Sequence, residues 1–129
     1  GCAAAISTID VYKEENLIEK AAETGVFFKK QLAKLLEAHS CVGDVRAIGL
    51  FGAVELVRDK KTREPLVPYG KDPQGIMPGI LGMLKERGFW NYSHENILIV
   101  APPLVITEGE ISEALEILDE VLYRVDEGI

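Results

Sequence analysis

Cysteine is scarce in this chain of 129 residues, which contains only Cys2 and Cys41. A disulfide framework needs more cysteines, and structural zinc sites favour close pairs such as C-x-x-C. We therefore predict two free thiols in a reducing compartment, with the cytoplasm as the default location.

Positive charge is also in short supply. Lys and Arg number 14 against 21 Asp and Glu, which leaves a formal net charge of −7. An acidic chain gains nothing from counterion release on a phosphate backbone, so neither nucleic acid nor an anionic membrane is expected as a partner. No apolar run approaches the roughly 20 residues that span a bilayer, and the uncharged start does not resemble a secretory signal.

Catalytic signatures are missing as well. The only histidines are His39 and His94, and neither has a Cys or Ser neighbour at a spacing typical of a nucleophile and base. The pattern of His, Cys and carboxylates matches no zinc signature. Gly49-x-x-Gly52 lies in a strand pattern and opens no helix, so it is a weak dinucleotide motif. The residues therefore predict no catalytic, cofactor-binding or metal site.

Helical patterns cover much of what is present. Helices are predicted over residues 2–15 and 17–38, separated by Asn16, and from about Pro78 to Arg87, where Gly88 suits the left-handed cap position. A capping-box pair, Thr107 and Glu110, predicts a last helix. Apolar residues at spacings of three and four mark the buried faces of the second and last helices: Leu17, Ala21, Gly25, Phe28, Leu32 and Leu35, then Ile111, Ala114, Leu115, Leu118, Val121, Leu122 and Val125.

Strand patterns lie in the middle and late parts of the chain. Residues 45–57 are apolar and β-branched, with Gly49 marking a bulge or hairpin turn. Loops are predicted at 39–44 and 58–74, the latter as a long loop or exposed hairpin. A short strand at 89–92, a turn at 93–96 and a strand at 97–100 follow. We predict a single α+β domain over residues 1–129, with one small antiparallel sheet and helices packed mainly on one face.

Four segments in the same order resemble class III pyridoxal-phosphate aminotransferases. They are Asp44-Val-Arg-Ala-Ile-Gly-Leu-Phe-Gly-Ala-Val-Glu-Leu-Val57, Ala101-Pro-Pro-Leu-Val-Ile-Thr-Glu108, Thr62-Arg-Glu-Pro65, and the opening residues 1–10 with Glu14-Glu-Asn-Leu17. The resemblance covers essentially the whole chain. It implies the C-terminal small domain of a fold type I enzyme that moves an amino group between an amine or amino acid and an oxo acid.

The same resemblance implies that the large, cofactor-binding domain is absent from this chain. The family's Schiff-base lysine and its cofactor-gripping residues lie upstream, so we expect no catalytic residue, no tightly bound cofactor and no activity in this segment alone. The uncharged residues 1–9 suit the middle of a buried helix, which suggests a fragment of a longer protein. The expected partners are the large domain of the same chain, a second subunit in a homodimer, and a small amine and oxo acid.

Substrate contact is the remaining question for this domain. Many family members place a carboxylate-binding arginine on it, either at the position of Ile99 or near Tyr92, and this chain has arginine at neither. Trp90, Tyr92 and His94 are the substrate-binding candidates, facing an amine, a sulfonate or a bulkier substrate. Trp90 and Tyr92 could equally be packing residues. A family arginine, Arg46, is expected to have a structural role.

Two other functions are compatible with the same sequence. An aminomutase, which shifts an amino group within one molecule, shares the cofactor and the small-domain fold. A binding or dimerisation module without chemistry belongs to a different class. An upstream large domain, with a lysine following a strand, would separate the two cofactor-dependent enzymes from the module.

Overall fold

Four helices form where the sequence patterns predict them, in a computed structural model that describes residues 1–128. They are α1 (Cys2–Glu14), α2 (Leu17–Ala38), α3 (Ile76–Glu86) and α4 (Glu108–Asp126). Asn16, with φ of 50°, separates α1 from α2. Pro78 falls in the first turn of α3, where a missing N–H costs little, and Gly88 follows its end at φ of 83°. Both hydrogen bonds of the predicted capping box are present at the start of α4.

The strands form one antiparallel sheet in the order β1-β2-β5-β4. Their bounds are β1 (Val42–Ile48), β2 (Phe51–Asp59), β4 (Tyr92–His94) and β5 (Ile97–Val100). A short strand, β3 (Glu64–Pro65), pairs with the far end of β2, so the polar segment after β2 begins as a hairpin. Gly49, at φ of 54°, lies in the turn between β1 and β2.

Two strand boundaries differ from the prediction. The first strand begins at Val42, inside the segment predicted as a loop, because Val42 and Asp44 pair with Leu56 and Glu55 of β2 across a bulge. The aromatic segment is not a strand over 89–92; the strand is Tyr92–His94, and the turn shrinks to Glu95 and Asn96. Pairing with β5 decides this, because His94 lies opposite Ile97.

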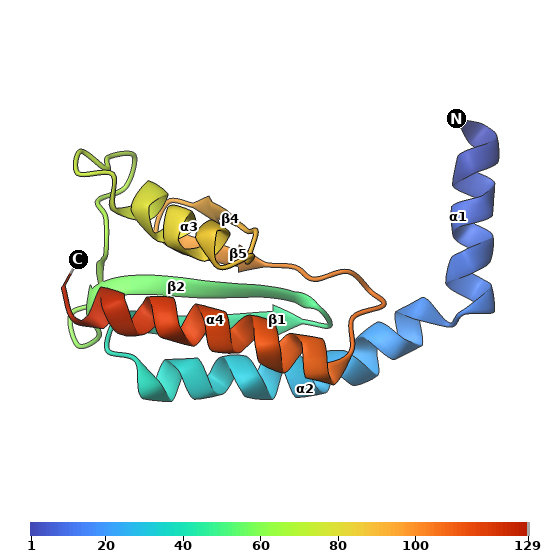
Figure 1. Cartoon of the computed structure of the whole chain (residues 1–129), viewed down its shortest axis with the longest axis horizontal. Helices are drawn as coiled ribbons and strands as arrows, with labels where there is room; N and C mark the ends of the chain where they lie inside the picture. The colour runs from blue at the N-terminus through green and yellow to red at the C-terminus, as the bar shows by residue number, and fades with distance from the viewer. Residues whose placement is uncertain (129) are drawn as a thin grey trace.

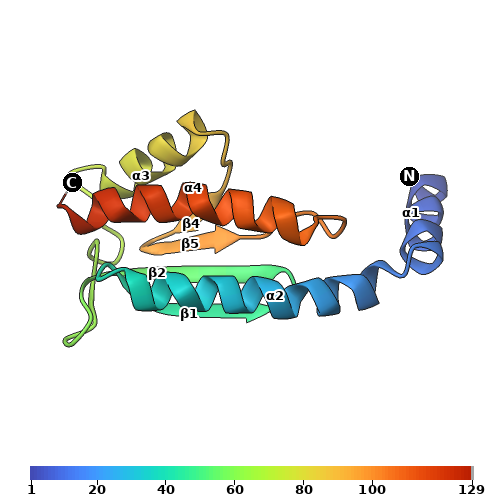
Figure 2. The same ribbon diagram turned by 60° about the horizontal axis from the view of Figure 1, so that its bottom comes forward.

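The α2, α3 and α4 helices lie on one side of the sheet, as Figures 1 and 2 show, and this confirms the predicted α+β class. The inward faces of β2 and β5 carry Val54, Leu56 and Leu98, all with no measurable exposure. Both predicted helical stripes, on α2 and α4, pack against these strands. The stripe residues that are fully buried are Phe28, Leu32, Ile111, Leu118, Val121 and Leu122. The core is therefore a single layer between the helices and the sheet.

Close backbone packing joins α2 to the hairpin turn. A Cβ placed on Gly25 of α2 would lie 2.6 Å from the Cα of Gly49 and 2.7 Å from its carbonyl carbon and oxygen. Glycine is thus required at position 25 for the helix to approach the turn.

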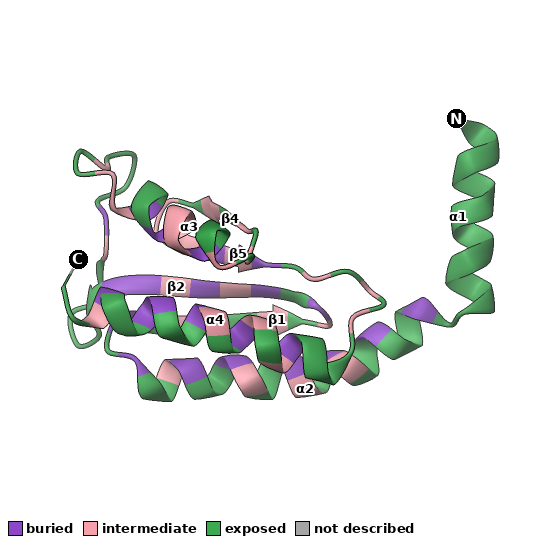
Figure 3. Ribbon diagram, in the orientation of Figure 1, coloured by how far each residue is buried: buried purple, intermediate pink, exposed green. Residues whose placement is uncertain are grey.

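The α1 helix projects away from the rest of the chain (Figures 1 and 3). The sequence predicts a buried helix here, yet none of its residues is buried by another segment of residues 1–128. Ile6 and Ile9 remain exposed on it. Among the described residues, no helix has both the length and the apolarity needed to cross a bilayer.

Candidate functional site

The sheet face opposite the helices is open, and strand alternation decides which side chains it presents. Two rows of cross-strand partners run across it: Arg46, Ala53, Ile99 and Tyr92, then Asp44, Glu55, Ile97 and His94. We call these eight residues the open face. Ala53, Ile97 and Ile99 make its middle mainly apolar, Glu55 on β2 is the charged residue among them, and the other polar side chains lie on the edge strands β1 and β4. Such a surface can receive a ligand or another domain, because none of the helices covers it.

Tyr92 and His94 come together on this face, as neighbours two residues apart on β4. Tyr92 is 65% exposed, and His94 is exposed as well. Tyr92 lies directly opposite Ile99. The two positions at which members of the resembled family carry an arginine are therefore adjacent across the β4–β5 pair. In this chain they hold Tyr92 and Ile99, and neither is a cation.

Trp90 occupies a different setting from the other two predicted site residues. It precedes β4, the residue is 77% exposed, and Lys85 of α3 places its Nζ 4.3 Å from the ring centroid. This is cation–π distance, worth about 0.5–1 kcal/mol at an exposed site. The contact supports a packing role for Trp90 as much as a ligand-binding one.

Arg46 is held by two carboxylates on the open face. Its Nη1 donates to Glu55 at 2.9 Å and also to Asp44. The hydrogen bond to Glu55, with a further contribution from Asp44, raises the pKa of the Arg46 guanidinium. Because both partners already neutralise it, Arg46 is not a free cation for a substrate carboxylate, and the geometry supports the structural role expected from the sequence.

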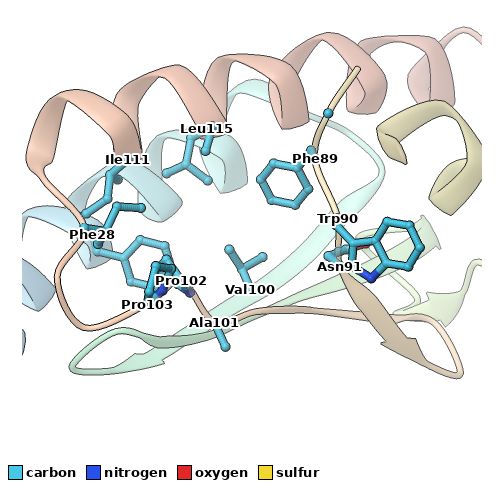
Figure 4. Close-up of a pocket in the computed structure, with 13 residues that line it drawn as sticks. Phe28, Phe89, Trp90, Asn91, Val100, Ala101, Pro102, Pro103, Ile111 and Leu115 are labelled. Carbon is cyan, nitrogen blue, oxygen red and sulfur yellow. The ribbon is translucent and has the colours of Figure 1, made fainter. Parts of the chain in front are cut away.

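An apolar cavity of about 210 Å³ lies between α2, α4 and the Pro102–Pro103 corner (Figure 4). Its lining residues are Phe28, Gly88, Phe89, Trp90, Asn91, Val100, Ala101, Pro102, Pro103, Ile106, Ile111, Ala114 and Leu115, none of them charged. Both amide atoms of Asn91 are buried without a hydrogen-bond partner in the described chain. The sequence offers no signal for this cavity, because its walls come from four separate segments.

No cofactor or metal centre assembles from the residues described. Within residues 1–128, no three His, Cys, Asp or Glu side chains gather closely enough to hold a metal ion. The Cys41 thiol is buried, and burial raises its pKa well above the usual range, so it does not supply a reactive thiolate. What the geometry offers is an open sheet face with three apolar residues in its middle, an arginine paired to two carboxylates toward β1, and a phenol and an imidazole on β4.

Comparison with known proteins gives this geometry a context. A sequence model described as aminotransferase class-III matches residues 1–122. The taurine:2-oxoglutarate aminotransferase of Bifidobacterium kashiwanohense, solved with PLP and glutamate, superposes with a TM-score of 0.94 at 38% identity, over 98% of this chain and 28% of that one.

Curated relatives point to the same group of proteins. Ethanolamine-phosphate phospho-lyase homolog 1 of Caenorhabditis elegans is 39% identical, over 94% of this chain and 25% of its own length. Adenosylmethionine-8-amino-7-oxononanoate aminotransferase of Methanocaldococcus jannaschii is 37% identical, over 97% of this chain and 26% of its own length. The chain thus spans about a quarter of the length of the curated relatives it matches.

Proposed function

The chain belongs to the class III aminotransferase family, and on that premise we propose that it is the C-terminal small domain of a longer pyridoxal-phosphate-dependent transaminase. The whole enzyme moves an amino group from an amine or amino acid to an oxo acid. The observation that carries this proposal is the superposition on the taurine:2-oxoglutarate aminotransferase with a TM-score of 0.94. A match over 98% of this chain but 28% of that enzyme is what a single domain of a larger enzyme produces.

The residues of this chain do not by themselves fit pyridoxal phosphate. The cofactor's aldehyde is held by a lysine as a Schiff base, and such lysines are activated by desolvation or by a nearby cation. All nine lysines of this chain are exposed on helix surfaces or loops. The proposal therefore assigns the lysine and the cofactor to the large domain and predicts that the 129-residue chain alone is inactive.

Exposed apolar surface supports a large domain as the main partner. Ile48 and Phe51 flank the β1–β2 turn with 85% and 61% exposure, and Ile6 and Ile9 remain exposed on α1. Large apolar side chains exposed together at the hairpin tip, and others along α1, are typical of surfaces that bind another protein segment. We assign the hairpin tip, the open face and α1 to contact with the large domain, within a homodimeric cytoplasmic enzyme.

The open face suggests the substrate class. Its arginine is already paired, so it holds no free guanidinium for bidentate binding of a carboxylate. The Tyr92 hydroxyl and a His94 ring N–H are donors that suit an amine substrate carrying a sulfonate or another hydrogen-bond acceptor. We propose that Tyr92 and His94, with Trp90 nearby, contact the amino donor.

A lyase is the main competing function. The Caenorhabditis elegans relative, whose name is that of a phospho-lyase, shares 39% identity with this chain. An aminomutase is a further alternative within the family, whereas the family match disfavours a module without chemistry. Reaction stoichiometry separates these enzymes: a transaminase consumes an oxo acid, a lyase releases a leaving group without one, and an aminomutase needs no acceptor.

The test uses the full-length protein loaded with its cofactor. Incubated with taurine and 2-oxoglutarate, it should form glutamate in proportion to the taurine consumed. Tyr92→Phe and His94→Gln should each raise KM for the amine about 2- to 10-fold, as expected for losing one hydrogen bond. Tyr123→Phe, at an exposed tyrosine on α4, is the matched control. A parallel incubation with ethanolamine phosphate and no oxo acid tests the competing reaction: release of ammonia and phosphate there, without glutamate formation from taurine, would replace the transaminase proposal with the lyase.

A further inference from the structure

The β1 strand closes one side of the sheet and leaves a long backbone edge without a partner strand. It has seven residues, and within residues 1–128 it pairs only with β2. The opposite edge strand, β4, has three residues. Natural proteins protect exposed edges by keeping them short or by twisting them away with bulges. The bulge of β1 lies between Val42 and Asp44, so residues 44–48 form a regular edge at the margin of the sheet (Figure 2).

The hairpin decides which backbone groups point outward from β1. Its turn has two residues, and Ile48 and Phe51 pair across it. The pair that closes such a turn is hydrogen-bonded, and hydrogen-bonded pairs alternate with non-hydrogen-bonded pairs along an antiparallel ladder. The N–H and C=O groups of Val45 and Ala47 therefore point away from β2, in the plane of the sheet, where another strand can pair with them.

Charge selects both the partner strand and its register. Asp44 and Arg46 flank Val45 and lie on the same face of the sheet. When two copies of β1 pair antiparallel about a two-fold axis at Val45, Asp44 of each copy lies directly opposite Arg46 of the other. A shift by two residues, the smallest that keeps the outward backbone groups paired, places two aspartates or two arginines opposite each other. Opposite charges stabilise a cross-strand pair and like charges destabilise it.

The strand is thus complementary to itself in the register centred on Val45. We propose that the outer edge of β1 is an interface between two copies of this chain, which joins their sheets into one continuous antiparallel sheet. The contact is isologous, because each copy contributes the same residues, and it doubles the number of subunits in the particle.

The ion pairs that Arg46 makes inside the chain leave room for this contact. Its Nη1 makes the bonds to both Asp44 and Glu55. A guanidinium carries five N–H donors in a planar fork, so its other N–H groups can reach Asp44 of the second copy. The Arg46 and Asp44 side chains are 51% and 48% exposed. Pairing two edges therefore adds a charged contact on each side of the axis and breaks none that exists.

The helix layer beside this edge also suits a second copy. Ala22 of α2 lines a groove with Ile48 at the end of β1, and helical periodicity places Val26 and Ala33 on the same flank of α2. Ala22, Val26 and Ala33 are exposed, Val26 by 58%. Lys29 is the charged residue on this flank, and its alkyl stem can carry the amine out to solvent. Small apolar residues there allow the α2 helices of two copies to lie close together.

The test measures association of the full-length protein by analytical ultracentrifugation over a range of concentrations. Asp44→Arg places like charges opposite each other on both sides of the axis and should raise the dissociation constant about 10-fold or more. Asp44→Arg/Arg46→Asp restores opposite charges across the axis and places an arginine opposite Glu55 of β2, so it should restore association. Glu113→Arg, exposed on α4, makes the same change of charge and is the matched control.

At concentrations where the Asp44→Arg protein has dissociated, the unsubstituted protein, the double variant and the control should each contain twice as many subunits. Equal association of the unsubstituted and Asp44→Arg proteins, or no recovery in the double variant, would overturn the β1 interface. The inference rests on the proposed function only for the existence of a longer protein. Glutamate formation from taurine by the unsubstituted protein tests that function separately, so either result can fail without the other.

Discussion

Replacing Gly25 with alanine tests the packing of α2 on the β1–β2 turn. The new methyl carbon would lie 2.6 Å from the Cα of Gly49 and 2.7 Å from its carbonyl atoms. Carbon atoms in contact normally sit about 3.5–4.0 Å apart, so the overlap is roughly 1 Å against backbone that cannot rotate away. Overpacking of this kind costs about 1–3 kcal/mol. Replacing glycine with alanine inside a helix stabilises the helix by roughly 0.5–1 kcal/mol. We therefore expect a net loss in the free energy of unfolding of about 1–2 kcal/mol.

Gly79→Ala is the matched control for this measurement. Gly79 lies in α3 and is exposed, and an alanine methyl group there would have no neighbouring heavy atom within 4 Å. Its replacement should therefore stabilise the chain by roughly 0.5–1 kcal/mol. Urea unfolding followed by circular dichroism measures both variants. A Gly25→Ala chain as stable as the Gly79→Ala chain would show that α2 does not approach the turn as closely as described.

Thr107→Ala removes the side chain that accepts from Glu110 N at the start of α4, and it should cost about 1 kcal/mol in a thermal melt; an unchanged Tm would mean the cap contributes nothing. Asn91→Leu removes a buried amide that has no partner in the described chain, so the free energy of unfolding should stay level or rise. Asn96→Leu is its counterpart, because Asn96 donates to the Leu56 carbonyl at 2.7 Å, and it should cost about 1–3 kcal/mol. A larger loss of unfolding free energy for Asn91→Leu than for Asn96→Leu would contradict the hydrogen bonding described. The pKa of Asp126 is lowered in the fold, so its stabilisation is present above the unfolded-state value of about 3.9 and is lost as pH falls through the lower folded value. When the free energy of unfolding is measured as pH is lowered, the Asp126→Asn chain should not show this loss of stability.

The helices could be predicted closely because their signals are local. Asn16, Pro78, Gly88 and the pair at Thr107 each act within one helical turn, and every one occupies the place its local chemistry requires. Strand boundaries were less predictable. Whether Val42 or His94 belongs to a strand depends on a partner elsewhere in the chain, Leu56 for the first and Ile97 for the second.

The features of the candidate site also divide into those that the sequence shows and those that depend on the fold. The absence of arginine at Ile99 and Tyr92 is a property of the sequence, as is the family resemblance that makes it informative. That these two positions are cross-strand partners is a property of the sheet register. Separation of Trp90 from Tyr92 and His94 also depends on where β4 begins.

The sequence by itself determined the family, the helix termini and the buried stripes, because each is encoded in neighbouring residues or in short periodic patterns. Only the tertiary structure decided which side chains share the open face, which cation is already neutralised there, and that His39 lies between two carboxylates. Asp119 and Asp126 are 80 and 87 residues from His39. No local pattern brings groups so distant together, because their contact results from packing α4 against the junction of α2 and β1.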